Sequence, residues 1–174
     1  MVAASDFDGE VREENLGLDV SFMYVIRQGT RVNVTTPAKL NLFFELTGRR
    51  PDGFHQVDTV MTSISLYDQL VMEPRDNPQI RLQCCWSYPN HASLGLEELP
   101  TTNSNLVYRA VKLLQSECDV QHGAEIVLRK QVPSQAGLGG GSSDAMAALC
   151  AANLAWNLGL SREELRALGA QLGS

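Results

Sequence analysis

The sequence predicts an α+β fold, because strand-like patterns fill its first half and helix-like patterns fill its second half. Short runs rich in β-branched and alternating apolar residues occur between residues 31 and 85, bounded by turn-forming clusters. From residue 105 onward apolar residues recur at helical spacing, and an alanine-rich segment follows a run of glycines. The chain has 174 residues, enough for one hydrophobic core, so a single domain is expected.

The first 30 residues are acidic and poorly periodic, unlike the rest of the chain. We expect residues 1–30 to be a flexible extension and residues 31–174 to form the folded domain. Met23 lies just before this boundary and is compatible with a later start of translation. The extension has no basic segment followed by an apolar run, so a secretory signal is not indicated and a cytoplasmic location is expected.

Strands are expected at 31–36, 40–46, 59–65, 69–73, 79–85 and, more briefly, 125–128. Pro37 should interrupt the first two because it cannot donate a ladder hydrogen bond, and Asp68 should separate the next two. The cluster PRDNP at 74–78 should end that part of the sheet. The segment RRPDGFH at 49–55 is expected to be a turn.

Helices are expected at 105–117 and 142–158, with a further helix beginning at Ser161. Asn103 or Ser104 is available as the N-cap of the first helix. The third begins with a capping box, in which Ser161 and Glu164 stand three residues apart.

Charge and hydropathy exclude two classes of partner. Lysine and arginine total 14 against 20 aspartate and glutamate, a net charge of -6, which argues against nucleic acid. No stretch approaches the roughly 20 apolar residues that a membrane-spanning helix needs, so no membrane partner is expected.

The glycine-rich run PSQAGLGGGSSDA, at 133–145, predicts an anion-binding loop. Its closely spaced glycines permit positive φ and remove side-chain bulk, so successive backbone N–H groups can converge on one phosphate. A helix starting near Ser142 would add its N-terminal partial positive charge. Ser142 and Ser143 could bring hydroxyls to a phosphate oxygen or a bound cation.

Other glycine-rich sites fit this run less well. A Walker A loop needs Gly-Lys-Ser/Thr at its end, but Gly141 is followed by Ser142. A dinucleotide fingerprint needs a glycine where Ser142 stands, and neither serine lies in the G-x-S-x-G of a hydrolase nucleophile elbow. A flexible glycine hinge is the remaining alternative for the loop taken alone.

The loop pairs with a second motif, TPAKLNLFFELTGRRPDGFH at 36–55. Together they resemble the 4-diphosphocytidyl-2-C-methyl-D-erythritol kinase family of the GHMP kinase superfamily, from about residue 31 to residue 174. The resemblance implies a ribosomal protein S5 domain 2-like fold, the GHMP kinase N-terminal domain, with a mixed sheet and helices on one side. It also implies ATP and Mg²⁺ as cofactors, and transfer of the γ-phosphoryl group to the 2-hydroxyl of cytidine diphosphate methylerythritol, a small-molecule substrate of the non-mevalonate isoprenoid pathway.

The resemblance assigns the nucleotide site to the glycine loop and to one distant residue. Asn105 matches a position that contacts adenine, although a role in capping the helix is an equal alternative. Ser142 or Ser143 is placed near the metal. The loop residues assigned to ATP are Pro133, Ala136, Gly137, Leu138, Gly139, Gly140, Gly141, Ser142 and Ser143.

The acceptor side is assigned to the first motif. Lys39 matches the catalytic lysine, with an exposed surface lysine as the alternative, and Asn41 matches a substrate-contacting amide or else a strand-edge residue. His55 matches the histidine that reads the cytosine edge, but a solvated histidine after a turn has the same pattern. Phe54 stands where the family commonly has a tyrosine stacked on cytosine, so stacking is kept and a hydroxyl is lost.

The expected general base is absent from the sequence. In the family an Asp-Val-Pro segment follows the part that resembles ALGAQLGS, and this chain ends at Ser174. The C-terminal substrate domain is missing as well, Asp52 is interpreted as a turn residue, and Asp144 has no claim to the role of base. The chain alone is therefore expected to have little activity. A non-catalytic nucleotide-binding fragment and a GHMP kinase with another small-alcohol acceptor remain alternatives, the latter disfavoured by RPDGFH.

Overall fold

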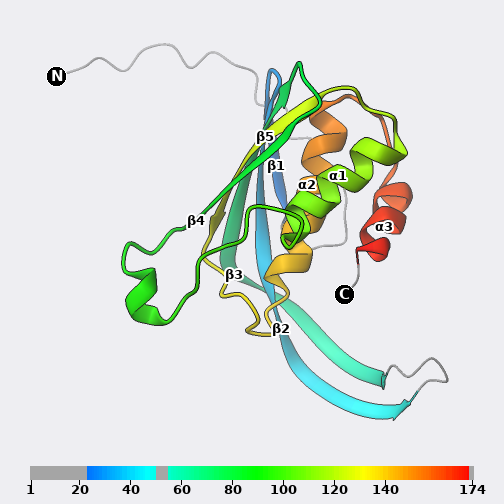
Figure 1. Cartoon of the computed structure of the whole chain (residues 1–174). Coiled ribbons are helices and arrows are strands. Elements are labelled where there is room, and N and C mark those ends of the chain that lie inside the picture. Colours follow the sequence, from blue (N-terminus) through cyan, green and yellow to red (C-terminus); the bar gives the residue numbers. More distant parts are fainter. Residues whose placement is uncertain (1–22, 50–54, 173–174) are drawn as a thin grey trace.

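The computed structural model describes residues 23–49 and 55–172, which form one mixed sheet with helices on one of its faces (Figure 1). The described strands pair in the order β1-β2-β3-β5-β4, and every pair is antiparallel except β4 with β5. The predicted α+β class, with a mixed sheet and one-sided helices, is therefore confirmed. The strands are β1 (Tyr24–Gln28), β2 (Arg31–Arg49), β3 (His55–Arg75), β4 (Ile80–Trp86) and β5 (Gly123–Lys130).

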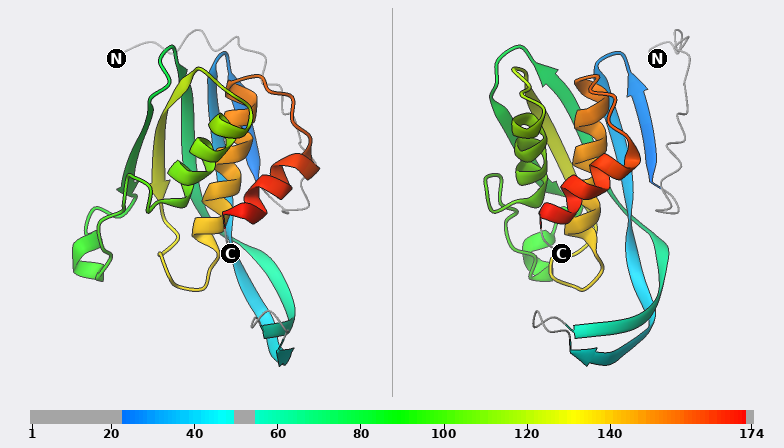
Figure 2. Two further views of the ribbon diagram at one scale, coloured as in Figure 1. Left: turned by 45° about the vertical axis from the view of Figure 1, so that its right-hand side comes forward. Right: turned by 90° about the vertical axis from the view of Figure 1, so that its right-hand side faces the viewer.

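Three α-helices and one short 3₁₀-helix complete the described part of the chain. Helices α1 and α2 lie side by side on the sheet, and α3 packs on their outer side, as the turned views in Figure 2 show. The alanines of α2 suit its place beneath α3 and beside α1, because small side chains let neighbouring elements approach closely. The helices are η1 (His91–Leu94), α1 (Leu106–Glu117), α2 (Gly140–Ala155) and α3 (Arg162–Gln171).

The core lies between the inner face of the sheet and α1 and α2. Alternate residues of the central strands point into it, including Val34, Leu70 and Ile126, all almost fully buried. They meet apolar side chains of α1 such as Val111 and of α2 such as Leu149. The apolar residues that alternate along the strands and those that recur at helical spacing along α1 therefore pack into the same core.

Two expected strand breaks are wrong. Strand β2 continues through Pro37, where the register with β3 shifts between Pro37 and Ala38. The pairing of β2 with β1 ends at Thr35, so Pro37 lies at a bulge with a partner strand on one side only, where its missing N–H is tolerated. Strand β3 likewise continues through Asp68, which is fully buried and hydrogen-bonded through its carboxylate.

The folded region begins earlier than the expected boundary at residue 31. Strand β1 pairs with the start of β2 through a tight hairpin in which Gly29 takes a φ of 62°. Residues 1–22 of the expected extension lie outside the described residues. At the other end of the chain, the capping box of Ser161 and Glu164 at α3 is confirmed.

Beyond the core, β2 and β3 extend together as a two-stranded hairpin arm, residues 40–49 and 55–62 (Figures 1 and 2). The arm bends away from the body, and most of its apolar side chains are exposed. The described part of the chain has no helix long and apolar enough to cross a membrane.

Candidate functional site

The glycine-rich loop connects the end of β5 to the start of α2 and has an alternating backbone. Gln135, Gly137 and Gly139 have φ values of 61°, 73° and 70°, whereas Ala136 and Leu138 between them do not have positive φ. A backbone that alternates between the left-handed region and negative φ can turn successive N–H groups toward one point, as in the concave nests that bind anions. Residues 134–137 are exposed, so this site is open to solvent.

The predicted Lys39 lies directly against this loop. Its backbone N–H donates to the carbonyl of Leu138 at 2.9 Å, which ties β2 to the loop. The methylene stem of Lys39 covers Gly139, where an added Cβ would stand 2.8 Å from Lys39 Cγ. The ammonium donates to Asn41 Oδ1 at 3.0 Å. Two of the residues predicted for the acceptor side, Lys39 and Asn41, are thus beside the loop.

Helix α2 adds donors to the same place. It begins at Gly140, two residues earlier than predicted, and its N-cap Gly139 offers no side chain to its first turn. The first N–H groups of a helix have no partner within it, so those of the α2 first turn are available to an anion. No acidic residue stands in that turn to compete.

A buried charged cluster, which we call the Lys130 cluster and which consists of Asp68, Lys130 and Asp144, lies under the loop. Lys130 Nζ donates to Asp68 Oδ2 and to Asp144 Oδ2, each at 2.5 Å. The three side chains are at most 5% exposed. None of the three was predicted to have a functional role. Lys130 and Asp144 are charged residues that stand on either side of the glycines between apolar segments, and this pattern could have indicated an ion pair.

Burial dominates the titration of this cluster. Loss of hydration raises the pKa of Asp144 to about 7, Lys130 partly opposes this, and the Asp68 carboxylate adds to it. Asp144 Oδ1 is buried without a hydrogen-bond partner among the described residues. The pKa of Lys130 is raised: desolvation lowers it, but the two carboxylates outweigh that effect. One ammonium therefore serves two carboxylates, and burial raises the pKa of one of them, Asp144.

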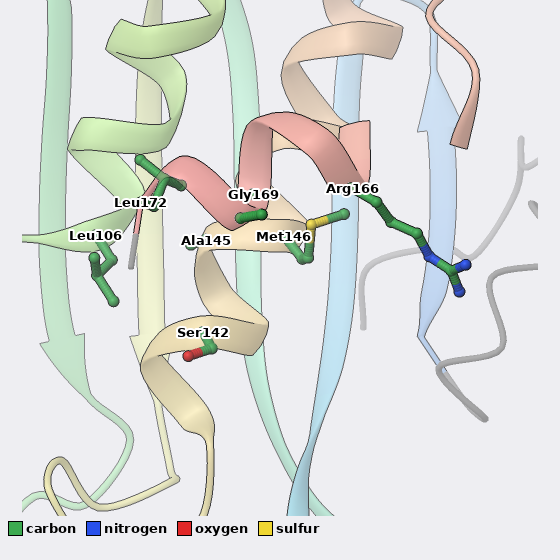
Figure 3. A pocket seen from close by; sticks show the side chains of 8 residues that line it. Leu106, Ser142, Ala145, Met146, Arg166, Gly169 and Leu172 are labelled. Carbon is green, nitrogen blue, oxygen red and sulfur yellow. The ribbon is translucent and has the colours of Figure 1, made fainter. Parts of the chain in front are cut away.

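Two hollows adjoin the site. One of about 370 Å³ is lined by Trp86, by residues 95–100 and by Ser134 and Gln135 of the loop. The other, of about 420 Å³, lies among α1, α2 and α3, where Ser142, Leu106 and Met146 are among its lining residues (Figure 3). The second has an apolar lining and no acidic group. The first is the one that touches the anion-binding loop.

No described residues form a group of three or more His, Cys, Asp or Glu side chains that could hold a metal ion. Asp144, in the second turn of α2, is bonded to Lys130 through Oδ2. Of the two serines predicted to lie near a metal, Ser142 is exposed and Ser143 is half-buried.

Comparison with known proteins gives a consistent family. The "GHMP kinases N terminal domain" matches residues 105–174. A "4-diphosphocytidyl-2-C-methyl-D-erythritol kinase" of Brevibacillus brevis is 40% identical over 144 residues, which are 83% of this chain and 46% of that protein. One of the same name from Alcanivorax borkumensis is 43% identical over 143 residues, 82% of this chain and 45% of that protein. The chain belongs to the GHMP kinases.

Solved structures agree with this membership. A crystal structure of 4-(cytidine 5'-diphospho)-2C-methyl-D-erythritol kinase superposes with a TM-score of 0.60 at 34% identity, covering 82% of this chain and 46% of that one. A homoserine kinase from Cytophaga hutchinsonii gives 0.62 at 18% identity, over 84% of this chain and 42% of that one, and shows the fold alone. The chain spans about half the length of the curated relatives it matches.

Among the other described residues predicted for the site are Asn105 and His55. Asn105 is the N-cap of α1, accepting from Val107 N at 2.9 Å, and it also donates to Pro100 O at 2.7 Å. It thereby holds the segment that lines the hollow beside Ser134. The capping alternative is observed, at Asn105 rather than at Asn103 or Ser104.

His55 is exposed at the start of β3, at the far end of the hairpin arm from Lys39 (Figure 1). The paired residues Lys39–Ser63 and Arg49–His55 are separated by ten positions along β2, roughly 33 Å of strand. Phe54, its neighbour, lies outside the described residues, so its predicted stacking role stays a prediction. The structure does not bring His55 to the loop.

Proposed function

We propose that this chain is the ATP-binding half of a kinase that phosphorylates 4-diphosphocytidyl-2-C-methyl-D-erythritol on its 2-hydroxyl. The observation that carries the proposal is the alternating backbone of residues 135–139 with Lys39 packed against Gly139. This arrangement places the backbone N–H groups of the loop, as donors to a phosphate, next to the positive charge of Lys39. The names of relatives about 40% identical over most of the chain supply the acceptor.

The ATP phosphates would lie on the loop amides of Ala136 through Gly141 and on the first turn of α2. The hollow beside the loop, lined by Trp86 and residues 95–100, is the proposed place for adenosine. Asn105 would act there indirectly, because it holds Pro100 in the wall of that hollow. Pro133 would set the entry of the loop without contacting the phosphates.

Lys39 would stabilise charge on the transferring phosphoryl group. Its ammonium is fixed by Asn41, and its stem is fixed by Gly139, so the charge is placed before the substrate arrives. Such placement is the main contribution a protein makes to phosphoryl transfer, which has little covalent chemistry of its own for side chains to perform. Asn41 would orient Lys39 and offer its amide N–H to the acceptor.

Mg²⁺ is proposed to arrive with ATP and to neutralise phosphate charge, with Ser142 or Ser143 as a hydroxyl ligand. Magnesium usually keeps several waters and binds few protein groups when a nucleotide supplies the others, which suits a site with so few acidic side chains. The cytosine end is proposed to be read by His55, the first residue of β3, with Phe54 as its stacking partner. Both substrates are small charged metabolites, and the cytoplasm is the proposed place of the reaction.

Two measurements test the proposal. The chain is titrated with ATP and separately with the cytidyl substrate, with homoserine and mevalonate as competing acceptors. We expect saturable binding of ATP and of the cytidyl substrate alone among the acceptors. Binding of ATP without binding of the cytidyl substrate would favour a non-catalytic nucleotide-binding module. Absence of ATP binding would refute the phosphate site.

Transfer itself is tested in a chimera that joins residues 23–174, which include strand β1, to the remaining half of the Brevibacillus brevis relative. Labelled γ-phosphate should appear on the cytidyl substrate and should be lost in Lys39→Met. The matched control is Lys112→Met, on α1, where the lysine donates to Gln115 instead of facing the loop. Transfer to homoserine or mevalonate in preference would place the chain with another GHMP kinase.

A further inference from the structure

The Lys130 cluster joins the two ends of the glycine loop. Lys130 is the last residue of β5, where the chain enters the loop, and Asp144 is in the second turn of α2, where the chain leaves it. Their hydrogen bond of 2.5 Å therefore joins the two ends of the glycine loop. Fixing both ends restricts the conformations that the loop between them can adopt.

Asp68 fixes the beginning of the same loop through the backbone. The ladder between β3 and β5 ends at the pair Gln69–Arg129. One residue further, Asp68 Oδ1 accepts from the N–H groups of Gln131 at 2.6 Å and Val132 at 2.9 Å. A side-chain carboxylate thus replaces the partner strand, so the chain leaves the sheet with its donors satisfied.

The cluster is also in contact with the end of the loop. A Cβ on Gly140 would stand 2.8 Å from Val132 Cγ1 and 3.4 Å from Lys130 Nζ. There is no room for a side chain between the ammonium and the backbone that begins α2. Lys130 and Val132 therefore pack closely against the backbone of Gly140.

We propose that Lys130 is a positioning residue for the phosphate-binding loop, held between Asp68 and Asp144 so that the loop amides stay converged. The inference rests on the proposed function, since it concerns the affinity of that loop for ATP. Lys130 does not touch the nucleotide in this arrangement. It acts through Gly140, Gln131 and Val132.

The test measures the ATP affinity of the whole chain for wild type and for Lys130→Met/Asp144→Asn. The double variant should bind ATP at least about tenfold more weakly than wild type does. Its Asp68 keeps two backbone donors, so the fold is expected to survive, as thermal unfolding will show.

A matched control and a second readout separate positioning from general loss of stability. Glu125→Gln removes the Arg75–Glu125 pair, which joins the same strands β3 and β5 away from the loop, and should leave ATP affinity unchanged. Amide hydrogen exchange without nucleotide should speed up at residues 131–140 in the double variant and stay unchanged at Ile126.

The outcomes distinguish the two proposals. If wild type binds no ATP, the proposed function fails, while the exchange measurement still tests the tie between Lys130 and the loop. If the folded double variant binds ATP like wild type with unchanged loop exchange, the positioning role is wrong.

Discussion

Gly139 combines two constraints that no other residue type satisfies. Its φ is 70°, and the Lys39 stem occupies the place of a Cβ. Gly139→Ala should therefore cost about 1–2 kcal/mol of unfolding free energy and weaken ATP binding, because either the loop or Lys39 must shift. Urea unfolding and ATP titration measure the two effects.

Gly29→Ala is the control for that substitution. Gly29 also has a positive φ, 62°, but nothing lies within 4 Å of its added Cβ, and it is in the β1–β2 hairpin. It should cost similar stability while leaving ATP affinity as in wild type. Equal loss of ATP affinity in both variants would mean that stability alone explains the effect at Gly139.

The raised pKa of Asp144 predicts that the free energy of unfolding decreases as the pH rises. Its pKa is raised from the ordinary value of 3.8 to about 7 in the folded chain, so between these values the folded state holds a proton that the unfolded state has lost. Stability from this group is therefore fully present below about pH 4, falls as the pH rises toward 7, and is constant above that.

Asp144→Asn should remove this fall, which is on the order of a few kcal/mol. Urea unfolding of wild type and variant at several pH values between 4 and 8 measures it. The difference in free energy should grow in favour of the variant with rising pH, since its amide oxygen can still accept from Lys130. A constant difference across the range would show that Asp144 is ionised throughout.

The residues that could be predicted are those whose partners follow from local sequence. Lys39 and the glycine loop were found because each lies in a recognisable motif, and the structure places them in contact. Asp68 was interpreted as a break because an aspartate within a strand pattern normally interrupts it. Its partner Lys130 is 62 positions away, and no pattern in one sequence reports a pairing over that separation.

At the scale of elements, two substitutions of Asn105 can separate its role as the N-cap of α1 from its hydrogen bond to Pro100. Asn105→Ala removes both the cap to Val107 and the bond to Pro100, and should cost about 1 kcal/mol of stability. Asn105→Asp keeps an acceptor for the cap but loses the donor to Pro100. We expect the aspartate variant to keep its stability and to bind ATP more weakly, as measured by unfolding and titration.

Ser161→Ala is the matched cap variant, because Ser161 begins α3 with a capping box. It should lose similar stability without changing ATP affinity. An aspartate variant of Asn105 with full ATP affinity would show that the bond to Pro100 does not shape the adenosine site.

The types of the elements were predictable, but their lengths were not. The helical period and the capping box located α1 and α3 to within a residue or two. Strands β2 and β3 were each predicted as two pieces, since Pro37 and Asp68 disfavour strands. The tertiary structure allows both residues within a strand. Pro37 has a partner strand on one side only, and the Asp68 carboxylate accepts from two N–H groups beyond the end of β5.

For the whole molecule, the division between body and arm could not be predicted. The sequence of the arm alternates like any strand pair, and nothing local says that no helix covers it. In the described structure the helices cover only the sheet of the body, and the apolar side chains of the arm face solvent (Figure 2). They include Leu40, Leu42, Phe43, Phe44, Leu46, Val57, Val60 and Met61.

This division predicts a contrast between two apolar substitutions. Phe44 is 55% exposed and Leu70 is 0% exposed. Phe44→Ser should change the unfolding free energy by less than about 1 kcal/mol, whereas Leu70→Ala should cost about 2–5 kcal/mol by leaving a cavity in the core. Phe44→Ser should also reduce binding of a dye that reports exposed apolar surface, which Leu70→Ala in the folded state should not do. Urea unfolding and dye fluorescence at one protein concentration measure both effects. A large loss of stability in Phe44→Ser would mean that the arm packs against part of the chain, in which case its apolar side chains belong to the core and not to the surface.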